Sequence, residues 1–460
     1  MPQIKTNKKT TKKTAVKGKG VKHKNSTKKT IVKESGVNYS VLKEQDTNKI
    51  LDDSWDFKKA NTKEFTHCFH SYPAMMIPQV ARRILDNYAY NSKLLFDPYC
   101  GTGTSLVEAN LKGINAIGTE INPLALLIAY SKTTKIDIQV LDLFLHNFSD
   151  YFFYVNFGNE RKQLENLPNI KNLDFWFSKQ VQIKLGQLLI FINNIKDLPI
   201  RNFFKVAFSE TVRECSFIKT GEFKLVRRKK INEIDEPDVF SKMIQKLKRN
   251  RQGLIDFEEN RIGNADTVIY DFNTVYTVPK KLIPNKSIDI IVTSPPYGDS
   301  RTTVAYGQYS RLSSEWLGYE NASKVDGSLM GGERRKHYHK FNSEILNEVI
   351  LKIQNQDKDR ARDVISFYED YEMSVNNIAN TIKKDGFACF VVGNRTVKGI
   401  KIPTDEITVQ LFEKNNFTHL ETIIRNIPNK RMPSKNSPTN VIGETSSTMK
   451  NEYIVICQRN

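Results

Sequence analysis

The strongest constraint on the fold is an apolar strand pattern that leads directly into a glycine-bearing turn. Residues 93–97 are typical of a buried β-strand, and the turn at 98–104 begins an amphipathic helix pattern that ends at Gly113. A second strand pattern, over 116–121, ends at the dipeptide Asn122-Pro123, which favours the start of a helix. Strand, turn, helix, strand and helix in this order predict a βαβα unit and therefore a parallel sheet.

The alternation of strands and helices resumes after a long helical interruption. A helix is predicted before the βαβα unit, at 75–85, and two more follow it, at 183–195 and 203–212. The run 287–292 is apolar enough for a strand that is buried on both faces. Later patterns predict helices over 364–383 and 407–414 and strands over 387–392, 419–425 and 452–457. We therefore expect an α/β fold with a mostly parallel, Rossmann-like sheet, helices on both faces and a helical insertion.

Shifts in composition predict the domain organisation. Residues 1–35 contain twelve lysines, one acid and no Phe, Tyr or Trp, which predicts a disordered arm. The arm has three interpretations: a solubilising tail, an electrostatic contact with phosphates, or a localisation signal. The other predicted parts are a linker at 36–65, the first half of the α/β domain at 66–130, a helical insertion at 131–262, and the second half at 263–460 with a polar insertion at about 318–362.

Charge and cysteine content limit the partners and the compartment. The 70 Lys and Arg residues exceed the 51 Asp and Glu residues, and the net charge of +19 favours a polyanionic partner such as nucleic acid or an anionic membrane surface. Five widely separated cysteines without a C-x-x-C pair indicate free thiols in a reducing compartment. The pairs His67/His70 and His337/His339 lack further ligands, so no metal is expected. No segment resembles a membrane span or a signal peptide, which predicts a soluble intracellular protein.

The glycine turn and the end of the second strand have the parts of a nucleotide-type site. Gly101 and Gly103 allow the backbone to approach a ligand, and Glu120, 17 residues after Gly103, can accept hydrogen bonds from ribose hydroxyls. The third glycine of a dinucleotide fingerprint is missing, and Asp97 stands at the tip of the first strand. An acid at that position suits the amino-acid end of S-adenosylmethionine (AdoMet) better than it suits a pyrophosphate.

A second motif follows the buried strand at 287–292, on the sheet edge where open α/β proteins bind ligands. It consists of Ser294, Pro295, Pro296 and Tyr297. The two prolines stiffen the turn and fix its carbonyl groups in space. A fixed carbonyl and the Ser294 hydroxyl can accept hydrogen bonds from an exocyclic amine, and the Tyr297 ring offers a stacking face for a planar base.

With these two motifs the chain resembles an amino-methylating DNA methyltransferase, and the S-P-P-Y form resembles the cytosine-N4 class of restriction–modification systems. The resemblance implies AdoMet as cofactor, double-stranded DNA as substrate, and a DNA-associated protein of the prokaryotic cytoplasm. It implies a catalytic role for the S-P-P-Y residues, and cofactor binding by Tyr72, Asp97, Tyr99, Gly101, Gly103, Thr104, Glu120, Asn122 and Asp266, the last as an adenine-contacting acid. A lysine often follows the family's Tyr-Pro-Ala element, whereas Met75 stands there in this chain.

Basic residues outside these motifs are candidates for DNA binding. They are Arg227, Arg228, Lys229 and Lys230 in the helical insertion, Arg301 after the catalytic motif, and Lys430 and Arg431 in a long loop near the C-terminus. The order of the motifs resembles enzymes in which target recognition is inserted between the two halves. A solvated helix face is the alternative interpretation of the basic run in the insertion, and the segments 318–362 and 426–440 are rival recognition elements.

We therefore predict a site-specific DNA methyltransferase that transfers a methyl group to the N4 amine of cytosine, with a restriction endonuclease for the same site as a further expected partner. Adenine-N6 methylation is the nearest alternative. An RNA base methyltransferase and a non-catalytic DNA-binding protein with a degenerate methylase fold are the others. Because the target atom is hidden in the duplex, the base must be flipped out of the stack.

Overall fold

The computed structural model describes residues 48–157, 167–231, 235–299, 303–337, 339–341, 343–427, 435–436, 446–447 and 449–460. Residues 48–460 cluster into one compact unit. The lysine-rich arm predicted for 1–35 lies outside the described residues, as do Arg301, Lys430 and Arg431.

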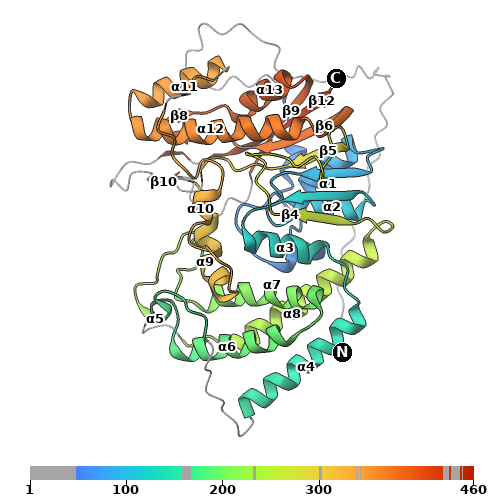
Figure 1. Cartoon of the computed structure of the whole chain (residues 1–460), viewed down its shortest axis with the longest axis vertical. Helices are drawn as coiled ribbons and strands as arrows, with labels where there is room; N and C mark the ends of the chain where they lie inside the picture. The colour runs from blue at the N-terminus through green and yellow to red at the C-terminus, as the bar shows by residue number, and fades with distance from the viewer. Residues whose placement is uncertain are drawn as a thin grey trace, which may run out of the picture. The chain divides into compact units, whose positions relative to one another are not determined.

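The described strands form an eight-stranded sheet in the order β1-β9-β12-β6-β5-β2-β3-β4 (Figure 1). Neighbouring strands are parallel except at β12, which runs antiparallel to both β6 and β9. This arrangement confirms the predicted α/β fold with a mostly parallel, Rossmann-like sheet. The strands are β1 (Lys49–Leu51), β2 (Leu94–Asp97), β3 (Asn115–Thr119), β4 (Thr267–Tyr270), β5 (Ile288–Thr293), β6 (Ile382–Val392), β9 (Phe417–Asn426) and β12 (Asn451–Arg459).

Helices cover both faces of this sheet. Because side chains alternate along a strand, Ile290 and Val292 of β5 pack in the same cluster as α1 (Pro78–Tyr88) and α2 (Thr104–Leu111). Ile288 and Ile291 face the opposite cluster, which includes residues from the helices that cover the other side. Those helices are α11 (Glu344–Gln354), α12 (Lys358–Ala379) and α13 (Thr404–Lys414).

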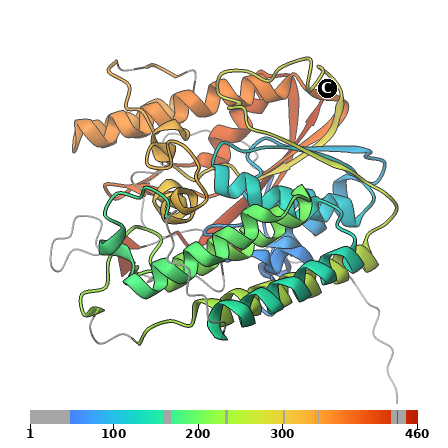
Figure 2. The ribbon, with the colours of Figure 1, turned by 60° about the horizontal axis from the view of Figure 1, so that its bottom comes forward.

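A separate group of helices surrounds its own apolar core next to α3 (Pro123–Thr133), as Figures 1 and 2 show. The group consists of α4 (Ile138–Phe157), α5 (Leu173–Trp176), α6 (Lys179–Asn194), α7 (Leu198–Cys215), α8 (Val239–Asn260) and α9 (Tyr306–Trp316). The core combines buried aliphatic side chains with aromatic rings, and Trp316 of α9 packs edge-on against Phe177 and Phe208. Since α9 follows the S-P-P-Y motif in sequence, this packing joins the helical segment to the second half of the α/β domain.

Shorter described elements complete the order. Two 3₁₀ helices, η1 (Asp53–Asp56) and η2 (Phe65–Phe69), precede α1, and α10 (Val325–Ser328) follows α9. Two small antiparallel pairs are β7 (Thr396–Val397) with β8 (Ile400–Lys401), and β10 (Lys435–Asn436) with β11 (Ser446–Ser447).

The segment predicted as a linker at 36–65 is structured from residue 48 onward. There β1 pairs with β9, and Trp55 is buried in the core of the sheet. The Asp56 carboxylate accepts hydrogen bonds from the backbone and side-chain N–H groups of Asn426. A three-residue edge strand is too short to show alternation, so its pairing with a distant strand leaves little signal in the sequence.

The first helix starts later than the sequence predicts, and the polar segment after α9 contains helices. The first helix begins at Pro78, because a residue that precedes proline is driven to extended geometry and Ile77 has φ −73° and ψ 138°. The polar segment at 318–362 contains α10, α11 and the start of α12, whose N-cap is Asp357. Its basic residues pair with acids of α12: Arg334 with Asp363 at 2.8 Å, and Arg335 with Asp370 at 2.5 Å.

Candidate active site

The topology creates a crevice at the carboxyl ends of β2 and β5. The chain leaves β2 toward β3 on one side and returns later to β5 on the other side, so β2 and β5 flank a switch point. The turn after β2 carries the glycine motif, and the residues after β5 carry the S-P-P-Y motif. The two motifs are therefore neighbours in space although almost two hundred residues separate them.

A pocket that encloses about 690 Å³ of space open to solvent lies at this point. Most of the residues predicted to bind a cofactor line it, together with Ser294 and Pro296 of the second motif. The lining also includes residues that the predicted site did not contain, namely Cys100, Thr102, Tyr306, Leu329 and the segment from Pro73 to Met76. The predicted lining residues are Tyr72, Asp97, Tyr99, Gly101, Thr104, Glu120 and Asn122.

The glycine turn leaves its backbone open toward the pocket. Gly101 has φ +51°, and a Cβ added to it would meet no atom within 4 Å, so a ligand can approach its peptide group. Gly103 has φ +77°, and an added Cβ would lie 3.1 Å from the Cβ of Ala129 on α3. The first glycine therefore provides room for a ligand, and the second allows α2 and α3 to pack closely.

Asp97 joins the two motifs. Its buried carboxylate accepts hydrogen bonds from the Ser105 hydroxyl, from the backbone N–H of Tyr99 at 3.1 Å, and from the Thr293 hydroxyl at 2.5 Å. Thr293 directly precedes Ser294, so this bond connects the glycine turn with the S-P-P-Y motif. Burial raises the pKa of Asp97 to about 6 although these hydrogen bonds oppose the rise.

Glu120 and Asn122 occupy the turn between β3 and α3. The Glu120 carboxylate accepts the backbone N–H of Asn122 at 2.7 Å, and burial raises the pKa of Glu120 to about 7. Asn122 caps α3 by accepting the backbone N–H of Leu124 at 3.2 Å, and its amide donates to the Tyr72 hydroxyl at 2.8 Å. The cap thereby fixes Tyr72 against the wall of the pocket.

Aromatic rings from distant segments meet at the rim of the pocket. Tyr72 stacks on Tyr306 of α9, with ring centroids 6.2 Å apart and planes inclined by 11°. Tyr309, one turn later, contacts the edge of Tyr72 and donates its hydroxyl to the carbonyl of Ser71 at 2.8 Å. These contacts place α9 beside the segment that precedes α1.

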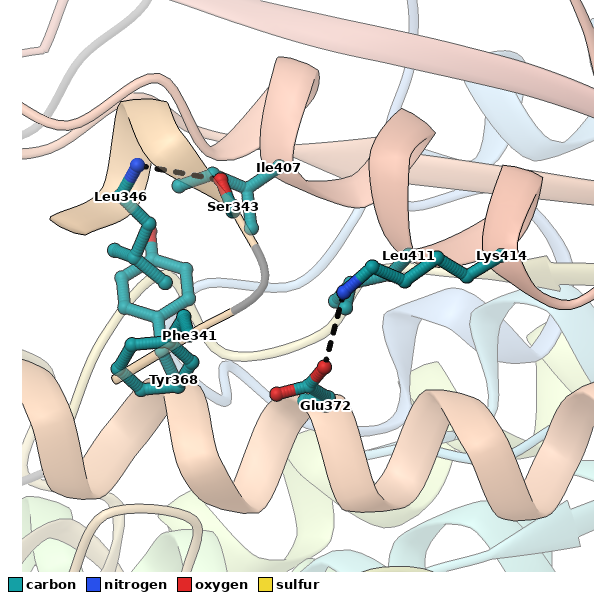
Figure 3. Close-up of a pocket in the computed structure, with 8 residues that line it drawn as sticks. All are labelled: Phe341, Ser343, Leu346, Tyr368, Glu372, Ile407, Leu411 and Lys414. Carbon is teal, nitrogen blue, oxygen red and sulfur yellow. Dashed lines mark hydrogen bonds and ion pairs between the residues drawn. The ribbon is translucent and has the colours of Figure 1, made fainter. Parts of the chain in front are cut away.

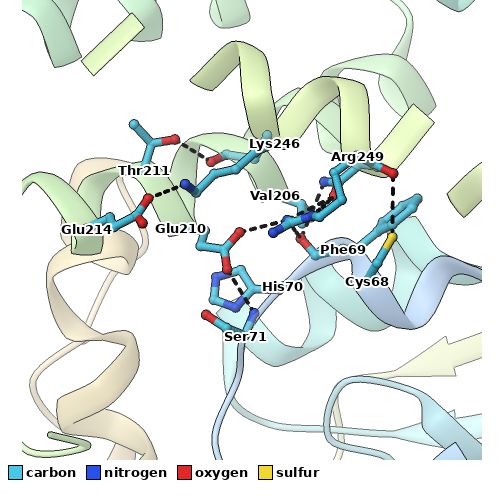
Figure 4. Close-up of polar contacts among 12 residues, drawn as sticks. Cys68, Phe69, His70, Ser71, Val206, Glu210, Thr211, Glu214, Lys246 and Arg249 are labelled. Atoms are coloured by element: carbon cyan, nitrogen blue, oxygen red, sulfur yellow. Dashed lines mark hydrogen bonds and ion pairs between the residues drawn. The ribbon is translucent and has the colours of Figure 1, made fainter. Parts of the chain in front are cut away.

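Polar contacts with the helical segment hold the residues before Tyr72 in place (Figure 4). Glu210 of α7 accepts the backbone N–H of Ser71 at 3.1 Å and pairs with Arg249 of α8 at 2.7 Å. Arg249 also donates to the carbonyl of Phe69 at 2.9 Å. Burial acts to raise the pKa of Glu210, but His70 and Arg249 outweigh it and hold this pKa at about 2. The helical segment thus holds in place the residues that lead into Tyr72, which lines the pocket.

The S-P-P-Y motif presents a hydroxyl and a ring at the end of β5. Ser294 and Tyr297 are partly exposed, and the Ser294 hydroxyl donates to the Tyr297 hydroxyl at 3.2 Å. The Tyr297 hydroxyl donates in turn to Glu452 of β12 at 3.1 Å. An added Cβ on Gly393, at the end of β6, would lie 2.6 Å from Cδ2 of Tyr297, so only glycine allows the ring this close to the backbone.

A buried ion pair supports the turn that follows the motif. Asp299 is fully buried, and its carboxylate lies 3.3 Å from Nη1 of Arg395. Gly298 has φ +149°, and a Cβ on it would lie 2.7 Å from the central guanidinium carbon of Arg395. The arginine therefore crosses the turn at a position where only glycine leaves space for it.

Asp266 lies apart from the pocket, contrary to the prediction. It precedes β4 and accepts the backbone N–H of Ala116 through its carbonyl, which places it at the amino edge of the sheet. Its side chain is 81% exposed and lies 3.7 Å from Lys135. Strand β4 begins after Asp266, so the acid at the carboxyl end of this strand is Asp271. The side chain of Asp271 is exposed, next to the backbone contact of Tyr270 with Glu120.

The basic run of the helical segment divides into two pairs. Arg227 donates to the carbonyl of Phe175 at 2.8 Å, and its guanidinium lies over the Phe175 ring. Arg228 donates to the carbonyl of Ile218 at 3.0 Å. Both arginines therefore stabilise the fold of the loop between α7 and α8. Lys229 and Lys230 are exposed.

A second cavity lies on the face of the sheet that α11, α12 and α13 cover. This cavity of about 210 Å³, between α11, α12 and α13, has mostly apolar walls, with Lys414 and Glu372 paired at 3.4 Å on one side (Figure 3).

Among the residues that the structure describes, no group of three or more His, Cys, Asp or Glu side chains is placed to hold a metal ion. Within the same residues, no helix combines the length and apolar character of a membrane span.

The fold and this pocket define an AdoMet-dependent methyltransferase. A family described as DNA methylase, of the N6 and N4 type, matches residues 4–131. The type II methyltransferase M.MvaI of Kocuria varians is 39% identical over 432 residues, which cover 89% of this chain and 94% of that protein. The chain therefore belongs to the amino-methylating DNA methyltransferases, the N6/N4 DNA methylase family.

Two further proteins show weaker similarity. The type II methyltransferase M.MjaII of Methanocaldococcus jannaschii is 28% identical over 193 residues, which cover 40% of this chain and 33% of that protein. Among solved structures, the rRNA methyltransferase AviRa of Streptomyces viridochromogenes matches with a TM-score of 0.30 and 9% identity, over 85% of this chain and 88% of that chain.

The chemistry of the pocket fits AdoMet. The open space in front of Gly101 suits a ligand that contacts the backbone, and the Glu120 carboxylate, which lines the same pocket, is of the kind that accepts hydrogen bonds from ribose hydroxyls. Asp97 at the same wall supplies negative charge for an ammonium group. We therefore assign Gly101, Glu120 and Asp97 to the binding of AdoMet.

AdoMet affinity is expected to rise as the pH rises through about 7. The pKa of Glu120 is raised to about 7 and that of Asp97 to about 6, so at lower pH both carboxyls must lose a proton before they serve the ligand. Below pH 7 the affinity should fall by roughly tenfold per pH unit where one ionisation limits binding. Calorimetric titration between pH 5.5 and 8 measures the AdoMet affinity at each pH. Glu120→Gln should flatten the dependence of this affinity on pH, whereas the control Glu258→Gln, on α8, should leave it unchanged. An unchanged profile in Glu120→Gln would contradict the assignment.

Proposed function

We propose that this DNA methyltransferase transfers the methyl group of AdoMet to the N4 amine of cytosine within a short double-stranded recognition sequence. The observation that carries the proposal is the position of the neutral Ser294 at the head of the S-P-P-Y motif, in the same pocket as Asp97 and Glu120. The Ser294 hydroxyl is a neutral acceptor for an N–H group of the amine, and the S-P-P-Y form of the motif resembles the cytosine-N4 class. The resemblance associates a charged or amide acceptor, Asp or Asn, in this place with the adenine-N6 enzymes.

The residues of the motif act on a poor nucleophile. The cytosine amine is conjugated with its ring, and hydrogen bonds from its N–H groups to the Ser294 oxygen and the Pro295 carbonyl favour a pyramidal nitrogen with a directed lone pair. Tyr297 offers its ring as a stacking surface for the flipped base. Bound AdoMet supplies an activated methyl group on a cationic sulfur. The protein contributes proximity, orientation and compensation of charge, with no covalent bond to the base.

We assign DNA binding to surfaces that flank this pocket. Lys229 and Lys230 are the exposed members of the basic run and offer charge to phosphates, whereas Arg227 and Arg228 shape the loop. The helical segment α4–α8 is our candidate for target recognition, because Glu210 and Arg249 contact the backbone of Ser71 and Phe69, directly before Tyr72 of the pocket. We propose that the enzyme serves a restriction–modification system with an endonuclease for the same sequence.

The product identifies the target base. DNA from cells that express the enzyme is expected to contain N4-methylcytosine, measured by mass spectrometry of the hydrolysed nucleosides. DNA from cells that express the Ser294→Ala variant is the matched control. N6-methyladenine as the modified nucleoside would overturn the cytosine proposal while the family and the cofactor remain. Base-resolution mapping of the same DNA then gives the recognition sequence.

A further inference from the structure

A chain of three side chains at the catalytic motif has a defined hydrogen-bond direction. The Glu452 carboxylate is paired with Arg425, and an ionised carboxylate has only acceptor atoms. The Tyr297 hydroxyl, 3.1 Å from Glu452, must therefore donate its single proton to that carboxylate. Toward Ser294, at 3.2 Å, the same hydroxyl can then act only as an acceptor. The proton of Ser294 is thus directed at Tyr297, and the lone pairs of Ser294 remain for another donor.

Glu452 is held in place by the strands around it. It lies on β12 directly opposite Arg425 of β9, and the two side chains form an ion pair. The Arg425 side chain is only 4% exposed and donates to the carbonyls of Trp55 at 2.8 Å and Asp56 at 3.2 Å. The buried arginine therefore holds one carboxylate oxygen, Oε2, while the other, Oε1, accepts the hydrogen bond from Tyr297.

We propose that Glu452 is a positioning residue that sets Ser294 as a hydrogen-bond acceptor for the amine of the target base. This inference rests on the proposed catalytic role of Ser294. Without the carboxylate, the Tyr297 hydroxyl can turn and donate to Ser294. The Ser294 proton would then point toward the N–H groups of the target amine, and two donors would face each other. Glu452 acts through Tyr297 and does not touch the base.

The first test compares three variants with a matched control. Glu452→Ala is expected to lower kcat by about 10-fold to 100-fold, the equivalent of one hydrogen bond to a charged group, while AdoMet affinity stays unchanged. Glu452→Gln keeps an acceptor oxygen and should retain more turnover than Glu452→Ala. Tyr297→Phe removes the hydroxyl that connects Ser294 with Glu452 but leaves the ion pair between Glu452 and Arg425 intact. It should lower kcat by about 10-fold. The control is Glu421→Ala on β9, which removes another carboxylate that accepts a tyrosine hydroxyl, that of Tyr88.

The decisive measurement is the coupling between Tyr297 and Glu452. In the Tyr297→Phe background, the further change Glu452→Ala should lower kcat by less than about 3-fold, because the hydrogen bond between Tyr297 and Glu452 is already absent. Thermal unfolding of each variant separates loss of folding from loss of turnover. Additive effects, or an unchanged kcat in Tyr297→Phe, would overturn the inference. Nucleoside analysis of the product tests the proposed function separately, since the coupling is read from rates whichever base is methylated.

Discussion

Replacing Ser294 by alanine is expected to lower kcat by about 10²-fold or more while AdoMet affinity stays within about twofold. The hydroxyl lines the pocket near the carboxyl end of β5, where the amine of the target must approach, and removal of one preorganised hydrogen-bonding group at a reaction centre costs about 10² to 10³ in rate. None of the hydrogen bonds that Asp97, Glu120 and Asn122 make involves Ser294, so binding of the cofactor should persist. Single-turnover kinetics together with calorimetric titration measure the two quantities.

The control for this variant lies at the other end of the same strand. Ser287 precedes β5 at its amino end and donates to the carbonyl of Pro284 at 2.7 Å, so Ser287→Ala changes the same residue type away from the pocket. Its turnover should match that of the unmodified enzyme. Loss of AdoMet binding in Ser294→Ala, or full turnover, would refute the catalytic role.

Replacing Arg82 by methionine is expected to lower the free energy of unfolding by about 3–5 kcal/mol at neutral pH, since it leaves a buried charge without its partner. Arg82 on α1 binds both oxygens of Glu108 on α2, at 2.8 and 2.9 Å. The Glu108 side chain is fully buried, and Nε2 of His67 lies 2.9 Å from Oε1, one of the two oxygens that Arg82 binds. Urea denaturation measures the change. Arg83→Met is the control on the same helix, where the guanidinium lies over Trp55 and Phe57.

The pH dependence of this effect has a defined sign. Burial acts to raise the pKa of Glu108, but His67 and Arg82 outweigh it, so the pKa lies below its ordinary value in the folded protein. The pair therefore contributes stability above the ordinary pKa of a glutamate, and this contribution is lost as the pH falls. The difference between Arg82→Met and the unmodified protein should shrink as the pH falls below about 4.5. A constant difference from pH 8 to pH 4 would show that the ion pair is not the source.

The sequence was sufficient to place the two motifs at one edge of the sheet, because the carboxyl ends of parallel strands meet there. Asp97, Glu120 and Ser294 each follow a short apolar strand with a clear pattern, and the structure brings them into one pocket. Asp266 was assigned from the resemblance, with no strand predicted beside it. Strand β4 begins at Thr267, so Asp266 lies at the amino edge of the sheet and Asp271 at the carboxyl edge.

Contacts that depend on strand order could not be predicted in the same way. Glu452 reaches Tyr297 because β12 lies between β6 and β9, and no local pattern in the sequence specifies that position. Tyr306 shares a pocket with Tyr72 because α9 packs against the segment before α1. The pairing of β1 with β9 joins residues more than 370 positions apart, and three residues carry too little pattern to indicate it.

The position of β12 also determines when the contact between Tyr297 and Glu452 can form during synthesis of the protein. This strand comes last among the described strands, yet it lies in the interior of the sheet, where it separates β6 from β9. A nascent chain can complete the glycine turn and the S-P-P-Y motif long before β12 leaves the ribosome, but until then β6 and β9 have no common neighbour and Tyr297 has no carboxylate to contact. The contact of Glu452 with Tyr297 therefore cannot form before β12 has been synthesised, so a chain that is still being translated up to that point carries the cofactor motif without this contact.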